Sequence, residues 1–206
     1  QTLPGVHLFV IGIKPSPARG YFEQEEIADN EMIAEIGSKD DMQPLKVLNR
    51  GFGGAHIAHV NYHFEDVIQR YSPEAIVFFC GTIDLTALKT PEETIQDFEI
   101  LKDRVHQTLP GVHLFVIGIK PSPARVYLEK EEIAYNEMIA EIASKDDLVT
   151  FIDVWDAMLS AEGERIPGLF VEDGSEIYFS QNIGKYKKNE ILKNLPIICR
   201  KIIFSQ

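Results

Sequence analysis

Three histidines follow a glycine-rich segment at spacings that could suit metal coordination. His56, His59 and His63 stand at positions i, i+3 and i+7, so on a continuous helix they would share one face. Imidazole rings grouped in this way could hold a metal ion. The chain lacks the His-Glu-x-x-His pattern and an obvious further ligand, however. We therefore predict no metal site and a partly exposed helix face, on which His56 lies close enough to the preceding loop to contact a bound ligand.

Short apolar runs supply the elements that would position such polar residues. They are rich in valine, isoleucine and phenylalanine and occupy residues 6–13, 45–48, 75–80, 112–119 and 149–154. Runs without strict alternation are typical of strands buried on both faces. Stretches with helical periodicity lie between and after these runs, at residues 55–71, 91–109, 129–143 and 183–203. Strands that alternate with helices predict an α/β fold with a parallel sheet and right-handed crossovers.

In a parallel sheet of this kind, functional residues gather in the loops that leave the carboxyl ends of the strands. The informative loops are therefore residues 14–19, 50–56, 81–85, 120–125 and 170–179. Arg125 lies in one of these loops, and its position leaves two alternatives open. Its side chain could line a cleft, or it could form a surface salt bridge.

Two of the predicted helices have clear local signals. In residues 129–143, Ile133 and Ile139 belong to the face predicted to be buried, whereas Glu132 belongs to the face predicted to stay in water. Thr90 precedes Pro91 at the start of another helix. Threonine is a favoured N-cap and proline a favoured first residue, so we predict that this helix begins at Pro91.

Composition and charge exclude several classes of function. The chain has 20 basic and 32 acidic residues and a net charge of −12, which argues against binding to nucleic acid or to an anionic membrane surface. Cys80 and Cys199 lie in apolar surroundings without metal-type spacing, so we expect buried thiols in a reducing, cytoplasmic compartment. No apolar run is long enough to span a bilayer. We expect no cofactor, and a single domain over residues 1–206.

Residues 1–41 return almost unchanged as residues 107–147. The two copies differ at only five of 41 aligned positions, the pairs Gly20/Val126, Phe22/Leu128, Gln24/Lys130, Asp29/Tyr135 and Gly37/Ala143. Each copy contains one predicted strand and one predicted helix. Because the strands are interchangeable, both copies can compete for the same places in the sheet. We therefore expect misassembly or domain swapping to be a hazard of this sequence.

Five segments of the chain together resemble one family of enzymes. They read LKVLNRGFGG, PEETIQDFEIL, IKPSPAR, FIDVWDAML and LFVEDG, in this order along the chain. Over roughly residues 42–206 the chain resembles the SGNH (GDSL-type) hydrolases, in the branch of platelet-activating-factor acetylhydrolase. The resemblance implies a flavodoxin-like, three-layer α/β/α fold with five parallel strands in the order 2-1-3-4-5. It also implies hydrolysis of carboxylic esters, acetyl esters among them, without a cofactor, by a monomer or a homodimer.

Only part of this family's catalytic set is present. The resemblance places the oxyanion glycine at Gly54 and the aspartate of the C-terminal pair at Asp173. Asp84 matches the aspartate of the third loop, but Ile83 occupies the place of the oxyanion asparagine and Glu176 that of the catalytic histidine. Two alternatives stay open for two of these residues. Gly54 could serve a tight turn, and Asp84 could cap its loop by accepting backbone N–H bonds.

The nucleophile position departs furthest from the family pattern. Lys14 stands about where the family has its serine, and Ser16 follows between two prolines, in a loop copied from the later unit. Because acyl transfer needs an activated hydroxyl, this replacement predicts lost or strongly impaired ester hydrolysis. Two alternatives remain. One is an active esterase with a relocated site that uses Ser16, His56 and Asp84 or Asp173. The other is a binding protein that holds a small ester or acyl ligand in the old cleft.

Overall fold

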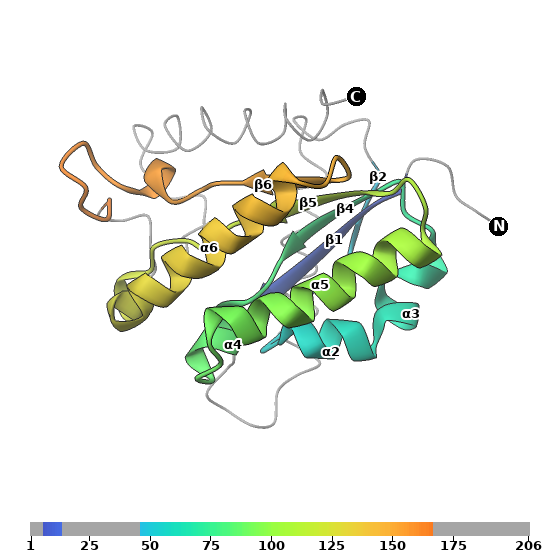
Figure 1. Cartoon of the computed structure of the whole chain (residues 1–206), viewed down its shortest axis with the longest axis horizontal. Coiled ribbons are helices and arrows are strands. Elements are labelled where there is room, and N and C mark those ends of the chain that lie inside the picture. Colours follow the sequence, from blue (N-terminus) through green and yellow to red (C-terminus); the bar gives the residue numbers. More distant parts are fainter. Residues whose placement is uncertain (1–5, 14–45, 167–206) are drawn as a thin grey trace.

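The computed structural model describes residues 6–13 and 46–166 of the chain (Figure 1). Within these ranges the strands form one parallel sheet: β1 (Val6–Ile13), β2 (Lys46–Asn49), β3 (Phe52–Gly53), β4 (Ala75–Phe79), β5 (His113–Ile117) and β6 (Val149–Ile152). Their order is β2-β1-β4-β5-β6, and β3 pairs with β1. The α/β class with a parallel sheet is therefore confirmed. The two-residue strand β3 was not expected, because it falls in a segment that the sequence predicted as a loop.

Strand β4 lies at the centre of the pairing pattern. Strand β1 pairs with one of its edges and β5 with the other. Along β4, Ile76 and Phe78 belong to one core cluster and Val77 to a second, and each of the three side chains is at most 2% exposed. Both faces of the strand are thus buried, which explains why this segment shows no alternation of apolar and polar residues.

The described helices lie on one side of the sheet (Figure 1). They are α2 (Ile57–Tyr62), α3 (Phe64–Val67), α4 (Thr82–Thr86), α5 (Pro91–Thr108) and α6 (Glu129–Ser144). Three 3₁₀ segments lie at Gln69–Tyr71, Pro123–Leu128 and Asp156–Met158. Their apolar residues pack with Ile76 and Phe78 of β4 in the larger core cluster. Among the described helices, none is long and apolar enough to cross a membrane. The helices predicted between β1 and β2 and at residues 183–203 lie outside the described residues, so the third layer stays a prediction.

Helix α5 begins where the sequence predicts. The Thr90 side chain accepts a hydrogen bond from the backbone N–H of Glu93 at 3.2 Å, and the Glu93 carboxylate accepts one from the Thr90 N–H at 2.9 Å. Pro91 is the first helical residue. These two reciprocal bonds form a capping box, which satisfies backbone donors that a helix start leaves without partners.

The single helix predicted for residues 55–71 is wrong. The chain breaks at His63, between α2 and α3, and again at Ile68. A contact from α5 accounts for the first break, because Arg104 Nη1 donates a hydrogen bond of 2.6 Å to the carbonyl oxygen of Asn61. The Arg104 guanidinium also lies over the ring of Phe64, 4.5 Å from its centroid. Arg104 thus takes a carbonyl that a continuous helix would use itself.

The break also separates the three histidines. His56 is the N-cap of α2 and His59 lies within it, whereas His63 ends it. The three side chains therefore do not share the face of one continuous helix. No group of three or more potential metal ligands occurs among the described residues.

Candidate functional site

Gly54 lies directly beyond the end of β3, at the carboxyl edge of the sheet. Strand β3 pairs with the end of β1, with Gly12 opposite Phe52 and Ile13 opposite Gly53. Gly54 has a φ angle of 67°, in the left-handed region where a residue with a Cβ atom is strained. The conformation suits a tight turn, which is one of the two roles that the sequence left open for this glycine. Through this pairing, the turn lies beside the end of β1, the strand after which the family has its nucleophile.

Asp84 is completely buried in the first turn of α4, which follows β4 almost directly. Its Oδ2 atom accepts a hydrogen bond of 3.1 Å from the backbone N–H of Ile57, at the start of α2. Its Oδ1 atom accepts one of 2.8 Å from Lys89 Nζ. The side chain is 0% exposed. Asp84 therefore connects the loop after β4 to the chain that follows Gly54, which is the capping role that the sequence left open.

His56 lies against the same carboxylate. Its Nδ1 atom is 3.3 Å from Asp84 Oδ1, and its side chain is 23% exposed. The Nδ1 atom makes no hydrogen bond to the described residues, so this contact is an electrostatic one that strengthens when the imidazole is protonated. The ring of His59 packs edge-on against that of His56, with centroids 4.9 Å apart. The structure thus brings together two of the residues that the relocated-site alternative requires.

Lys89 extends this network to helix α5. Its Nζ atom lies 2.8 Å from Asp84 Oδ1 and 2.6 Å from Asp97 Oδ2. Burial alone would lower the pKa of Lys89, but the hydrogen bonds and charges of the two carboxylates outweigh it and raise this pKa above its usual value. The lysine is therefore charged at neutral pH, and it holds the loop after β4 against α5.

The loop after β4 has no amide side chain at the expected place. Ile83 is half-buried there, and its side chain has no hydrogen-bond donor. Gly81, two residues earlier, has a φ angle of 117°, and a Cβ atom on it would lie only 2.9 Å from Cζ of Tyr135. The loop thus requires glycine for its shape.

Cys80 precedes this loop and is a buried, free thiol, as the sequence predicted for this cysteine. Its Sγ atom donates to the carbonyl oxygen of Ala55 at 3.4 Å. Burial raises the pKa of the Cys80 thiol far above its usual value, and the charge of Asp84 acts in the same direction. A thiol held in its neutral form is a poor nucleophile, so Cys80 is not suited to nucleophilic catalysis.

The loop after β5 contains a buried ion pair that sequence reasoning did not find. Arg125 Nε lies 3.2 Å from Glu132 Oε1, and the two side chains are 9% and 1% exposed. Burial raises the pKa of Glu132 to about 7, although the charge of Arg125 acts in the opposite direction. Arg125 therefore forms neither a surface salt bridge nor an exposed cleft wall. The sequence feature that could have indicated this ion pair is the recurrence, in both copies, of an arginine and a glutamate seven residues apart.

This pair also changes which face of α6 is buried. Glu132 was predicted to lie in water and Ile133 in the core, but Glu132 is 0% exposed and Ile133 is 36% exposed. Asn136 takes part in the same buried face, because its side-chain amide exchanges two hydrogen bonds of 2.8 Å with the backbone of Ile119. Polar contacts to the loop after β5 thus set the rotation of the helix.

Comparisons with known proteins agree with this architecture. The model of the GDSL-like Lipase/Acylhydrolase family matches residues 12–181. The chain belongs to this family. Comparison with curated proteins found no match.

Solved structures of three other proteins are similar to that of this GDSL-family chain. A candidate platelet activating factor from Streptococcus pneumonia is 16% identical, with a TM-score of 0.66 over 95% of this chain and 83% of that protein. A mutant of Axe2, an acetyl-xylooligosaccharide esterase from Geobacillus Stearmophilus, is 14% identical, with a TM-score of 0.65 over 99% and 96%. A carbohydrate esterase family 3 protein from Talaromyces cellulolyticus is 16% identical, with a TM-score of 0.62 over 96% and 98%. At these identities the likeness shows the fold alone.

The predicted site of this GDSL-family chain is therefore described in part. Gly54, Ile83 and Asp84 lie at the carboxyl edge of the sheet, as its topology requires. Four other predicted site residues lie outside the described residues: Lys14, Ser16, Asp173 and Glu176.

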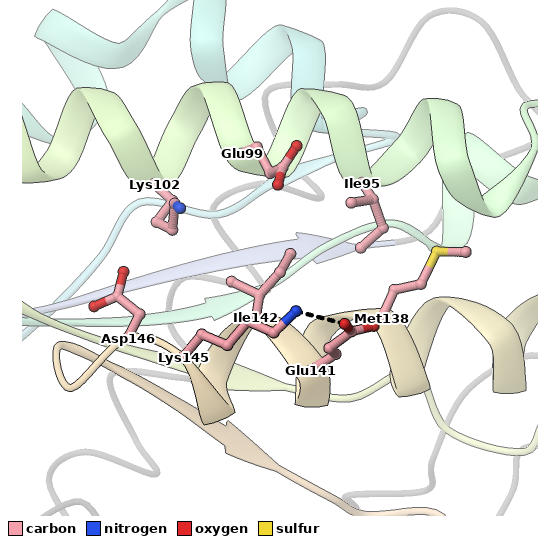
Figure 2. Close-up of a pocket in the computed structure, with 8 residues that line it drawn as sticks. All are labelled: Ile95, Glu99, Lys102, Met138, Glu141, Ile142, Lys145 and Asp146. Carbon is pink, nitrogen blue, oxygen red and sulfur yellow. Dashed lines mark hydrogen bonds and ion pairs between the residues drawn. The ribbon is translucent and has the colours of Figure 1, made fainter.

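A pocket of about 350 Å³ lies elsewhere, between α5 and α6 (Figure 2). Its apolar lining comes from Ile95, Met138 and Ile142. Its charged lining comes from Glu99, Lys102, Glu141, Lys145 and Asp146. The pocket belongs to the outer helix layer and includes none of the predicted site residues, so we do not assign the ester site to it.

Proposed function

We propose that this chain is a carboxylic ester hydrolase scaffold of the GDSL family whose catalytic activity is lost or strongly impaired. The observation that supports this most directly is the loop after β4. It presents Ile83 at the place of the oxyanion asparagine, and its Asp84 is fully buried by contacts to Ile57 and Lys89. In this loop Asp84 contributes to the framework of the site, and Ile83 supplies no side-chain donor to an oxyanion.

The expected size of the loss follows from the missing groups. Removing one oxyanion donor lowers turnover by about 100- to 1,000-fold. Removing the nucleophile or the base of a triad lowers it by about 10⁴- to 10⁶-fold, and further losses within the triad add little. Lys14 and Glu176 at the positions of serine and histidine therefore dominate, and Ile83 adds to an effect that is already nearly complete.

The finer features of the proposal follow from the resemblance of the sequence. The chain is a member of the platelet-activating-factor-acetylhydrolase-like branch, with the flavodoxin-like strand order 2-1-3-4-5 in one domain. A copy of residues 107–147 has replaced the unit that held the nucleophile. The ancestral substrates are small esters such as acetyl esters, a class that also fits Axe2, the acetyl-xylooligosaccharide esterase of similar structure. We expect a cytoplasmic protein that forms monomers or homodimers and needs no cofactor.

Hydrolysis of p-nitrophenyl acetate tests the proposal. We expect the full chain to release p-nitrophenol at a rate close to that of the same assay with heat-unfolded protein. Turnover clearly above this background, abolished by Ser16→Ala, would contradict the proposal, because it would show a working nucleophile.

The contact between His56 and Asp84 favours a second candidate, an esterase with a relocated site. A carboxylate 3.3 Å from an imidazole can orient the ring, as in known triads. If this candidate is correct, His56→Gln abolishes hydrolysis and the exposed control His63→Gln retains it. Loss of activity in both variants would instead indicate a general effect on α2.

A binding role for the old cleft is the remaining alternative. Thermal-shift measurements with short-chain carboxylic acids and acetylated sugars test this role without any need for turnover. A rise in the melting temperature at millimolar ligand supports it, because a ligand that binds only the folded state stabilises that state. An unchanged melting temperature with every such ligand counts against it.

A further inference from the structure

The two copies of the repeat flank the same strand in the same register. His7 of the first copy and His113 of the second both pair with Ala75 of β4, on its opposite edges. The next three residues of each copy continue this pairing in step along β4. Hydrogen bonding of the strands therefore gives no reason for one copy to prefer one edge, and side chains must make the distinction.

Among the five differences between the copies, one places a polar, ionised side chain against a buried apolar one in the described residues. At four of these positions the residue of the second copy is exposed (Val126 and Lys130), half-buried (Ala143) or buried (Leu128). The buried Leu128 corresponds to Phe22, which is also apolar. The fifth position is Tyr135, which is 0% exposed. The first copy has Asp29 there. A fully buried aromatic residue thus corresponds to an aspartate, whose side chain is ordinarily ionised at neutral pH.

Tyr135 fits its surroundings closely. Its hydroxyl group donates a hydrogen bond of 3.2 Å to the carbonyl oxygen of Cys80. Its ring lies so close to Gly81 that a Cβ atom on that glycine would be 2.9 Å from Cζ. Burial raises the pKa of Tyr135 well above its usual value, and negative charges on Cys80 and Asp84 would act in the same direction. The packing site between β4 and α6 therefore suits a neutral hydrogen-bond donor and disfavours a negatively charged side chain.

An aspartate at this place would be unfavourable for three reasons. An ionised carboxylate has no proton to donate, so the Cys80 carbonyl would lose its partner. The carboxylate itself would be buried near Asp84 without a cation or donor of its own. The smaller side chain would also leave a cavity where the aromatic ring packs.

We propose that Tyr135 directs the strand of the second copy to the sheet position between β4 and β6, and that Asp29 excludes the first copy from this position. The exclusion applies to the first copy of the same chain and to that of a second chain. The interaction that is affected is thus one between two copies of this protein. The difference between Tyr135 and Asp29 limits domain swapping, in which the repeated unit is exchanged between chains. This inference does not depend on whether the protein hydrolyses esters.

Refolding of two variants of the full chain tests the proposal. Asp29→Tyr gives the first copy the tyrosine that packs between β4 and α6. Gln24→Lys is the control: it also removes one difference between the copies, but at a position that is exposed in the second copy. Each protein is unfolded in urea, refolded at several concentrations and measured by size-exclusion chromatography with light scattering. We expect a several-fold larger, concentration-dependent fraction of dimers and higher oligomers for Asp29→Tyr than for the unchanged chain and Gln24→Lys. Equal distributions for all three proteins would overturn the proposal.

A second pair of variants tests the same idea through stability. Tyr135→Phe keeps the ring and removes only the hydroxyl, whereas Tyr135→Asp installs the residue of the first copy. We expect Tyr135→Asp to be far less stable in urea, or unfolded, and Tyr135→Phe to remain folded. If Tyr135→Asp unfolds at the same urea concentration as Tyr135→Phe, the place does not discriminate between the copies and the proposal is wrong.

Discussion

The buried carboxyl group of Glu132 should make the stability of this protein depend on pH in a predictable way. Glu132 is 0% exposed and pairs with Arg125 at the start of α6. The perturbation is Glu132→Gln, which keeps a carbonyl oxygen for Arg125 Nε and removes the titrating group. Glutamine has nearly the same volume as glutamate, so the packing around α6 should be retained.

The magnitude follows from the pKa of this carboxyl group. Burial raises it from an ordinary value of 4.5 to about 7 in the folded protein, despite the opposing charge of Arg125. Between these two pH values the folded protein binds a proton that the unfolded chain has released. The free energy of unfolding therefore falls as the pH rises from about 4.5 to about 7, and levels off above that. The difference between the two pKa values corresponds to about 3 kcal/mol over this window.

Urea unfolding followed by circular dichroism measures this effect directly. The free energy of unfolding is determined near both ends of the window for the unchanged chain and for Glu132→Gln. We expect the unchanged chain to lose about 3 kcal/mol more than the variant as the pH rises, since the other titrating groups contribute alike to both proteins. Glu137→Gln, at an exposed position of the same helix, is the matched control and should behave like the unchanged chain. Equal pH dependence in Glu132→Gln and the unchanged chain would refute the reasoning.

Substitutions test three further features of the structure by urea unfolding. Asp84→Ala removes the acceptor for Ile57 N–H and Lys89 and should cost about 2–3 kcal/mol, with a smaller loss for Asp84→Asn; equal losses would show that the acceptor does not matter. Gly81→Ala should destabilise more than Gly111→Ala, because both have positive φ but only the Cβ at position 81 meets Tyr135. Thr90→Ala should cost about 1 kcal/mol through loss of the capping box, and no change would contradict the cap.

Elements with strong local signals could be predicted from the sequence. The strands β4, β5 and β6 were predicted from their apolar runs, because strands buried on both faces need little more than apolar, β-branched residues. The start of α5 was predictable because Thr90, Pro91 and Glu93 act within a single turn. The loops of the candidate site followed from topology, since the carboxyl ends of parallel strands meet at one edge.

Contacts between distant residues account for what the sequence did not show. The break at His63 depends on Arg104, which reaches the carbonyl of Asn61 from 43 positions away. The rotation of α6 depends on Arg125 attracting Glu132 into the core, against the ordinary preference of glutamate for water. Neither partner can be recognised from periodicity, because a helical pattern records which residues are apolar and not which polar residues will find a buried partner.

The same distinction supports the proposal that a copied unit preserves the fold and impairs the activity. A strand such as Val6–Ile13 can lie beside β4 in the register of its copy, because the sheet edge offers the same backbone groups on either side. The exit loop is different, since its residues serve one particular place. After β5 the loop supplies Arg125, whose partner Glu132 belongs to the same copied unit, and both recur in the first copy as Arg19 and Glu26. After β1, the copied loop therefore carries residues suited to an ion pair within the unit. Acyl transfer needs an activated hydroxyl at this position, so the copied loop supports the proposed loss of activity.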